Sequence, residues 1–320
     1  MSRYVRNTAV LMKVETAYGT DAAPAAATDA MLLRKFTCKP IDAKMVKVPE
    51  VRPYFGMGMD LVGASFVSGS FEVSLASSGT LGTAPMWGRI LRACAFAEAV
   101  TASARVDYTP ISTSLEGCTL YYYDDGVLKK ALGVRCDITS FKLGFGDVPQ
   151  MAVKFIGLDG GASAVASPAL TLSAWKAPLT VNPTNSSLVT LGGSYSAGVL
   201  SGGTTYTTKG LELSLGNVVN YIELLGAQSV DITDRDVKGK ITFDLTPAQE
   251  IANEAIVKAG TATSIGLLHG VAAGYSILTY LPNVQLENPV KDDLNGRRVI
   301  TYDLNPMPLA GNDEWRIVAL

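Results

Sequence analysis

The residues that most often carry out chemistry in proteins are sparse in this chain. It has one histidine, His269, so a catalytic triad or a histidine-based metal site would have to be built around that residue. His269 is followed by Gly270 in a segment whose pattern predicts a hairpin turn, and we expect a turn or core histidine there. No G-x-S-x-G sequence marks a nucleophile elbow, and Val237–Lys240 lacks the upstream glycine of a phosphate-binding loop.

Two groups of carboxylates are the other candidates for chemistry. Asp231, Asp234 and Asp236 form one group, and Asp292 and Asp293 form the other. Paired carboxylates serve acid–base chemistry or bind calcium. Neither group has the spacing of an EF-hand loop, and both lie beside turn signals, where aspartate hydrogen-bonds the local backbone. We therefore expect solvated turns, no metal, no cofactor and no enzymatic activity; a hydrolase built on one of these clusters is the alternative.

Composition places the chain among well-packed globular proteins. Its 320 residues are 48% hydrophobic and 18% charged, which is enough for two domains with their own cores. The 27 Lys and Arg residues nearly balance the 29 Asp and Glu residues, so the bulk charge does not favour tight binding to nucleic acid or to an anionic membrane. Abundant glycine, 31 residues, favours many short strands joined by turns.

The cysteines and the first residues bear on the compartment. No metal-ligand spacing joins the four cysteines, so we expect free thiols in a reducing cytosol, with one disulfide pair as the alternative. They are Cys38, Cys94, Cys118 and Cys136. Residues 1–6 lack the apolar run of a signal peptide, which predicts cytosolic synthesis. The uncharged segment Ala259–Gln285 contains glycines and a proline, and it predicts a two-strand ladder instead of a membrane span.

One order of elements, strand, helix, hairpin and strand, is written twice. In the first half the strand is predicted at 69–75, the helix at 85–100, the hairpin turn at 125–126 and the last strand at 151–156. In the second half the strand is predicted at 239–245, the helix from 246, turns at 269–270 and 295–296, and the last strand at 298–304. Short strands are also possible at 170–172 and 187–191, and further strands are expected at 210–215 and 229–233. Few residues match between the halves, so the order of elements is the basis for inferring a duplicated module.

The second helix has the clearer boundaries. Thr246 can cap it, Pro247 suits its first turn, Gln249 completes a capping box, and Gly260 can end it in the left-handed conformation. An apolar stripe is expected to lie against the strands. Its residues are Ile251, Ala252, Ala255 and Ile256.

These patterns give a mainly β (α+β) fold with two tandem β-sandwich or barrel modules, each with one flanking helix. The predicted layout is an N-terminal arm (1–30), a first module (31–160), a Gly/Ser/Thr-rich connecting segment (161–205) and a second module (206–320). After a strand at Leu32–Cys38, the long loop 39–63 interrupts the first module. Loops of this length usually contact a partner, and a disordered surface loop is the alternative.

Several phrases spread over most of the chain resemble one family. They are Glu15–Thr20, Gly69–Val73, Pro85–Ala93, Leu120–Gly126 with Gly133–Asp137, and Asn305–Glu314. Together they resemble the major tail tube proteins of long, non-contractile-tailed bacteriophages, and look most like the larger versions carried by siphophages of Gram-negative bacteria.

The resemblance implies a structural virion protein. Barrel-like modules with one flanking helix would join strands into an inner barrel around a channel for DNA passage into the host, and the long loop would stack one ring on the next. The inter-ring contact candidates in and beside that loop are Lys44, Lys47, Glu50, Arg52, Tyr54 and Phe55. Family members with one module form hexamers, so two modules point to a homotrimer with pseudo-sixfold symmetry.

The resemblance also implies partners and a location. The partners are the chain itself and the tail terminator, distal tail and tape-measure proteins, with DNA passing through the lumen without specific binding and no membrane partner. The protein would reside in the virion tail, after the host cytoplasm. We expect a lumen lined mainly by Asp, Glu, Ser, Thr and Asn, because a basic bore would retain DNA. The alternative is a β-sandwich carbohydrate-binding or adhesin-like module, with Trp175 or Tyr195 as a sugar platform.

Overall fold

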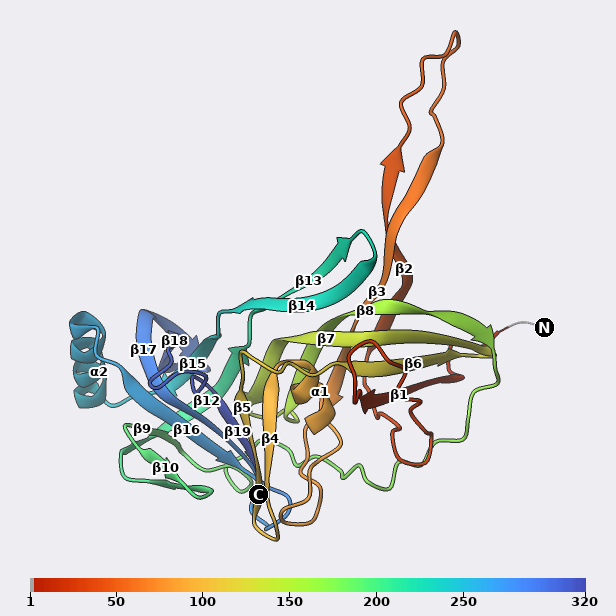
Figure 1. The fold of residues 1–320 in the computed structure, drawn as a ribbon. Helices are drawn as coiled ribbons and strands as arrows, with labels where there is room; N and C mark the ends of the chain where they lie inside the picture. Colours follow the sequence, from red (N-terminus) through yellow and green to blue (C-terminus); the bar gives the residue numbers. More distant parts are fainter. Residues whose placement is uncertain (1–2) are drawn as a thin grey trace.

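The chain is built almost entirely of antiparallel strands, as the computed structural model of residues 3–320 shows (Figure 1). The strands of the first half are β1 (Thr8–Val14), β2 (Phe36–Lys47), β3 (Asp60–Ser74), β4 (Phe96–Thr101), β5 (Arg105–Pro110), β6 (Cys118–Asp124), β7 (Val127–Gly144) and β8 (Gln150–Ala164). Those of the second half are β9 (Val189–Leu191), β10 (Ser194–Ser196), β11 (Val199–Ser201), β12 (Thr204–Ser214), β13 (Asn217–Leu224), β14 (Ala227–Arg235), β15 (Lys238–Asp244), β16 (Thr263–His269), β17 (Ile277–Leu294), β18 (Arg297–Pro306) and β19 (Arg316–Ala319). The helices are α1 (Gly88–Ala93) and α2 (Pro247–Ala259).

Most of these strands belong to one sheet that runs through both halves of the chain. Its main path is β2-β3-β8-β7-β12-β15-β18-β17-β19-β5-β4. The two halves pair in two places: the end of β7 pairs with β12, with Gly144 opposite Gly210 and Phe141 opposite Leu213, and β19 pairs with β5. The hairpins β10–β11 and β13–β14 form two small separate sheets. The mainly β fold expected from the sequence is confirmed.

The pairing order is the same in the two halves. In the first half the strands pair in the order β1-β6-β7-β8-β3-β2, and in the second in the order β9-β16-β17-β18-β15-β12. The second series closes into a barrel because β9 also pairs with β12. The first series closes where Leu11 of β1 forms an isolated bridge with Ala30, in the segment that leads into β2. Backbone hydrogen bonds lie on either side of that bridge.

Gly69 and Gly239 hold equivalent places in these two series. Gly69 on β3 lies opposite Cys38 of β2, and Gly239 on β15 lies opposite Leu213 of β12. A Cβ on Gly69 would lie 2.2 Å from the Thr37 carbonyl oxygen and 2.7 Å from the Phe155 ring. A Cβ on Gly239 would lie 2.8 Å from the Glu212 carbonyl oxygen and 2.5 Å from a Leu213 methyl group. Glycine is therefore required at both positions by the close approach of a neighbouring strand.

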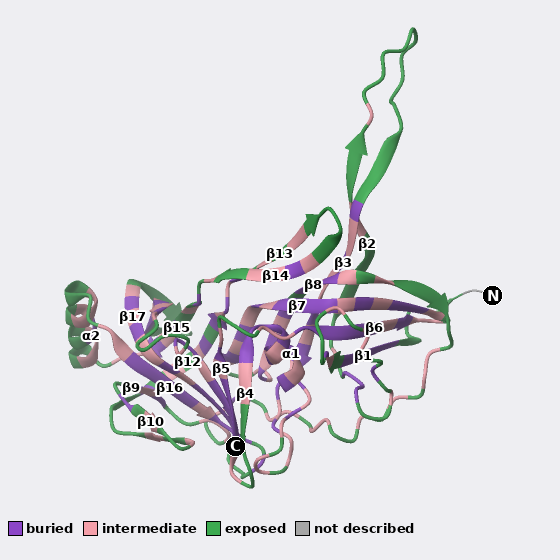
Figure 2. Cartoon of the chain, viewed as in Figure 1, coloured by how far each residue is buried: buried purple, intermediate pink, exposed green. Residues whose placement is uncertain are grey.

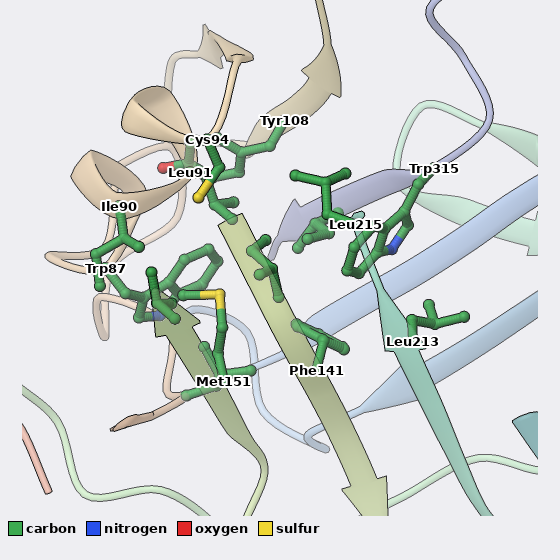
Figure 3. Close-up of a cluster of buried hydrophobic side chains, with 14 of the residues drawn as sticks. Trp87, Ile90, Leu91, Cys94, Tyr108, Phe141, Met151, Leu213, Leu215 and Trp315 are labelled. Atoms are coloured by element: carbon green, nitrogen blue, oxygen red, sulfur yellow. The ribbon is translucent and has the colours of Figure 1, made fainter. Parts of the chain in front are cut away.

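The core is continuous across the two halves. One cluster of buried side chains includes residues of α1, of β7 and β8, and of the second half. Figure 3 shows Trp87 and Leu91 of the α1 region near Phe141 of β7, with Leu213, Leu215 and Trp315 from the second half beside them. Trp315 meets both Phe96 and Phe141 edge to face, with ring centroids 5.9 and 5.3 Å apart. The halves are thus packed as one body in this region.

The helices differ from the prediction in two ways. The helix expected over 85–100 ends at Ala93, because Ala95 adopts a left-handed conformation and Phe96 begins strand β4, which pairs with β5. Helix α2 has the expected capping box and left-handed Gly260, but its expected apolar stripe is wrong. Ile251 is 70% exposed and Ala252 and Ala255 are also exposed, whereas Asn253 is buried.

The loop predicted over 39–63 is largely strand, since β2 and β3 extend it into a long hairpin whose connecting segment is 48–59. Residues 170–172 are not a strand, while 189–191 is β9. The uncharged segment forms the β16–β17 ladder, as expected, and the four cysteines are free thiols. Within residues 3–320, no helix is both long and apolar enough to cross a membrane.

We predict that Gly69→Ala and Gly239→Ala each lower the free energy of unfolding by about 1–3 kcal/mol, because the new methyl group has to displace backbone atoms of the adjacent strand. Chemical denaturation followed by tryptophan fluorescence measures the change. Ser65→Ala, a partly exposed position on β3, is the control and should alter the stability by less than about 0.5 kcal/mol. An alanine variant as stable as the parent would contradict the close approach.

Candidate assembly surfaces

The most prominent feature of the surface is the β2–β3 hairpin, which extends well away from the body (Figure 1). We call residues 39–63 the arm and 48–59 its tip. Register shifts between Lys39 and Asp42 and between Ala43 and Met45 mark its base, and irregularities of this kind bend and twist a strand pair. The Ser68 hydroxyl donates to Asp42 at 2.7 Å there. The arm is thus shaped by its own strands.

The tip exposes large apolar side chains. Relative exposures are 105% at Val51, 108% at Phe55, 81% at Met57 and 65% at Met59, and Figure 2 shows the arm exposed along most of its length. Clustered apolar side chains of this kind mark interaction surfaces in soluble proteins. Each large side chain would contribute about 1.5–3 kcal/mol if a partner buried it fully.

The six predicted contact residues all lie on the arm. Lys44 and Lys47 are exposed on β2, and the others are in the exposed tip. The only ion pair among them in the described residues joins Arg52 to Glu50 at 2.6 Å. The prediction did not include Val51, Met57 and Met59, which are as exposed as Tyr54 or more so.

A second hairpin, β13–β14, connects the paired strands β12 and β15, as the arm connects the paired bases of β2 and β3. It lies over the first half, where Tyr221 stacks on Phe66 with centroids 5.0 Å apart. Its tip exposes Leu224 and Leu225. The sequence pattern predicted a strand at 229–233, within β14, but gave no sign that this hairpin is a counterpart of the arm.

Tyr18 holds this hairpin to the first half. Its hydroxyl accepts from the Val230 amide at 2.6 Å and donates to the Val230 carbonyl at 3.1 Å. The Arg135 guanidinium lies 4.7 Å from the centre of the Tyr18 ring and pairs with Asp231 at 2.7 Å. Burial raises the pKa of Tyr18, so the hydroxyl keeps its proton and can serve as both donor and acceptor at neutral pH.

The loop that carries Tyr18 is fixed in turn by a buried carboxylate. Glu15 accepts from the Thr119 hydroxyl at 2.8 Å and from the Gly133 and Gly19 amides at 2.7 Å each. A buried carboxylate with three donors is well satisfied. The phrase Glu15–Thr20 therefore acts as a clamp between the N-terminal segment, β7 and the β13–β14 hairpin.

Some strand edges remain without a partner within the described residues. Strands β2 and β4 end the main path of the sheet, and β17 beyond Val284 pairs on one side only, with β18. Residues 288–293 of β17 are all exposed. Open edges invite further strand pairing and are a liability in an isolated monomer.

The chain matches a family of known proteins over most of its length. The family model described as "Phage tail tube protein" matches residues 6–305. The chain belongs to the phage tail tube protein family. No curated protein matches it. Membership supports a structural component of the virion tail that assembles with itself into a tube, and it confirms the resemblance seen in the sequence.

The carboxylate clusters of this tail tube protein have structural partners. Asp231 pairs with Arg135, Asp236 lies 3.2 Å from Lys238, and Asp293 accepts from the Gly296 amide in the β17–β18 turn. Among residues 3–320, no group of His, Cys, Asp and Glu is arranged to hold a metal. The clusters therefore act as ion pairs and turn caps.

His269 is a buried structural residue of the tail tube fold. Its Nε2 donates to the Leu179 carbonyl at 3.2 Å, and its Nδ1 lies 2.9 Å from the Ser186 hydroxyl. Burial lowers the pKa of His269, so the imidazole is neutral at pH 7. The core histidine expected from the sequence is found at the end of β16.

Neither aromatic residue suggested for a sugar platform offers a free ring. Trp175 donates from its indole to the Ala30 carbonyl at 2.9 Å and packs against the core. Tyr195 lies between Tyr280, at 5.7 Å between centroids, and the Arg316 guanidinium, at 4.8 Å. Sugar platforms need an open aromatic face, and these rings are engaged within the fold.

We predict that Tyr18→Phe loosens the β13–β14 hairpin while leaving the barrels folded. Losing both hydrogen bonds to Val230 should cost about 1–2 kcal/mol and should speed amide exchange in residues 217–235, measured by hydrogen–deuterium exchange. The control is Tyr4→Phe, since Tyr4 is 72% exposed. Unchanged protection of the hairpin in Tyr18→Phe would contradict the clamp.

Proposed function

We propose that this protein is the repeating subunit of a siphophage tail tube, stacked in rings around a channel through which DNA passes into the host. The observation that carries the proposal is the arm with its exposed apolar tip, on a chain that belongs to the tail tube family. Isolated in water, that tip leaves Val51, Phe55 and Met57 without contacts. A neighbouring ring would bury them and so hold the rings in register.

The same proposal places three chains in each ring. Both halves have the pairing order described above, and Gly69 and Gly239 have matching surroundings. We infer that the two halves are copies of one module, residues 31–160 together with β1 from the segment before them, and residues 206–320 together with β9 from 161–205, so that three chains would supply six similar units. The partners would be further copies of the chain and the proteins at the tube's ends and in its lumen.

The polar face of the long sheet is our candidate for the lumen. Residues on this face alternate with the buried ones of β3, β12, β15 and β18, and several of its charges are matched in pairs. Lys35 contacts Glu72 at 2.8 Å and Lys240 contacts Asp303 at 3.5 Å. Serine and threonine, such as Thr242 and Thr301, lie between them. A neutral, ion-paired lining would let DNA slide without retaining it.

The arm is tested by replacing residues 48–59 with Asn-Gly, a turn that suits a two-residue hairpin. We expect soluble, folded protein that no longer forms long tubes in negative-stain electron micrographs, because shortening a loop costs the fold little. The triple variant Val51→Ser, Phe55→Ser, Met57→Ser should act in the same direction. The control Val199→Ser removes an exposed apolar side chain from β11. Tubes of normal length from both arm variants would refute the role of the arm.

Ring stoichiometry is tested by cryo-electron microscopy of assembled tubes. We expect three chains per ring, because each chain would contribute two modules of one ring. The same map reveals which face of the sheet lines the bore and whether its net charge is positive. A ring of six chains would overturn the trimer, and a positively charged bore would overturn the neutral lumen, although either result could leave the tube assignment standing.

A further inference from the structure

The strand pairing of β7 with β12 that joins the two halves, which we call the internal joint, suggests how two chains could be joined. At the end of β7, residues Phe141–Gly144 pair antiparallel with Gly210–Leu213 of β12. Glu212 lies opposite Lys142 on one face, and the buried Leu213 lies opposite the buried Phe141 on the other. This joint satisfies both strand edges within one chain.

Each strand of that joint has a counterpart whose edge is open. Starting from the equivalent glycines, Gly239 lies opposite Leu213 and Leu304, and Gly69 lies opposite Cys38 and Phe155. Leu213 of β12 therefore corresponds to Cys38 of β2. The next strands in the two series are β7, which pairs with β8, and β17, which pairs with β18. Following the register across these pairs, Phe141 of β7 corresponds to Lys291 of β17. In the described residues, neither Lys35–Cys38 nor Lys291–Leu294 has a strand on its outer side.

We propose that Lys35–Cys38 of one copy pairs antiparallel with Lys291–Leu294 of a second copy of this chain, in the register of the internal joint. That register sets Thr37 opposite Asp292 and Cys38 opposite Lys291. The proposal rests on the proposed tube function, which supplies the second copy. It identifies the two edges and the register that would close the ring.

The charges on the two edges are complementary in this register. Asp292 would lie opposite Thr37, with Lys35 and Lys39 as its diagonal neighbours on the same face. Diagonal side chains on paired strands are about 7–8 Å apart, within reach of a lysine. In the same register, Lys291 and Asp293 would lie opposite Cys38 and Phe36, whose side chains pack against the core, as Phe141 and Leu143 lie opposite Leu213 and Leu211 in the internal joint. The register therefore rests on the equivalence with the internal joint, and the charges around Asp292 are compatible with it.

The joint is head-to-tail, because β2 and β17 are different surfaces of the same chain. Interfaces of this kind form closed rings or open helices, and each chain uses one edge of each type. Helix α2 adjoins the β17 edge through the Lys291–Glu250 ion pair at 2.5 Å, which lies on the partly buried side of the helix. A neighbour seated on β17 would approach this helix, whose Ile251 is exposed.

A single substitution tests the register because Cys38 is a native thiol. In Lys291→Cys tubes, the new thiol should lie opposite Cys38 of the neighbouring copy, close enough for a cross-strand disulfide. Burial raises the pKa of Cys38 to about 11, so an added oxidant such as copper–phenanthroline is needed. We expect covalent dimers and larger multimers on non-reducing gels. Cys94, Cys118 and Cys136 are fully buried and should not compete.

The matched control is Asp292→Cys, one residue away on the opposite face, which should stay monomeric under the same oxidation. Thr37→Cys combined with Asp292→Cys should restore the cross-link and serves if Lys291→Cys does not assemble. Monomers from both designed pairs in well-formed tubes, or equal cross-linking in the control, would overturn the joint while leaving the tube function intact. Parent protein that never forms tubes would count against the proposed function and, with it, against the joint.

Discussion

The fold depends on one requirement, which is that the backbone amides and carbonyls along strand edges find partners. The pairing of β7 with β12 satisfies two such edges and makes one sheet of what would otherwise be two barrels. Because the pairing brings Leu213 and Leu215 against Phe141 and α1, the same contact also builds the shared core. The edges that stay open, on β2 and at the end of β17, are then the natural places for growth of the assembly.

Around this sheet, the N-terminal segment fixes parts that pairing alone would leave loose. Buried Glu15 orders the turn that carries Tyr18, and Tyr18 binds β14 from the second half. Tyr18 and Val230 are 212 positions apart in the chain. The polar groups of the clamp are nearly all paired, although Arg135 Nε lacks a partner among the described atoms.

The sequence predicted helices and strands correctly where interactions between neighbouring residues determine them. The capping box at Thr246 and the left-handed Gly260 set both ends of α2, and alternation set β15 and β16. It could not show which face of α2 turns inward, because the buried residue there is Asn253, whose polarity hides it from an apolar pattern.

The end of α1 was missed for a related reason, since Ala95 carries no sign of its left-handed conformation. The arm was recognised as a candidate contact from its length and composition, but its strands were not predicted because exposed strand residues lack the alternation that burial imposes. The open edges and the register across β7 and β12 depend on long-range pairing, which no local pattern encodes.

The two hairpins that interrupt the halves are unequal, and this inequality limits how rings can be stacked. The arm projects from the body, whereas β13–β14 is held down on the first half by Tyr18 and Phe66. In a ring of three chains, six similar modules would carry only three arms. Neighbouring rings could then engage in three equivalent rotational settings instead of six. Twisting forces would then pass from ring to ring through three arms only. The gaps between the arms would allow the tube to bend.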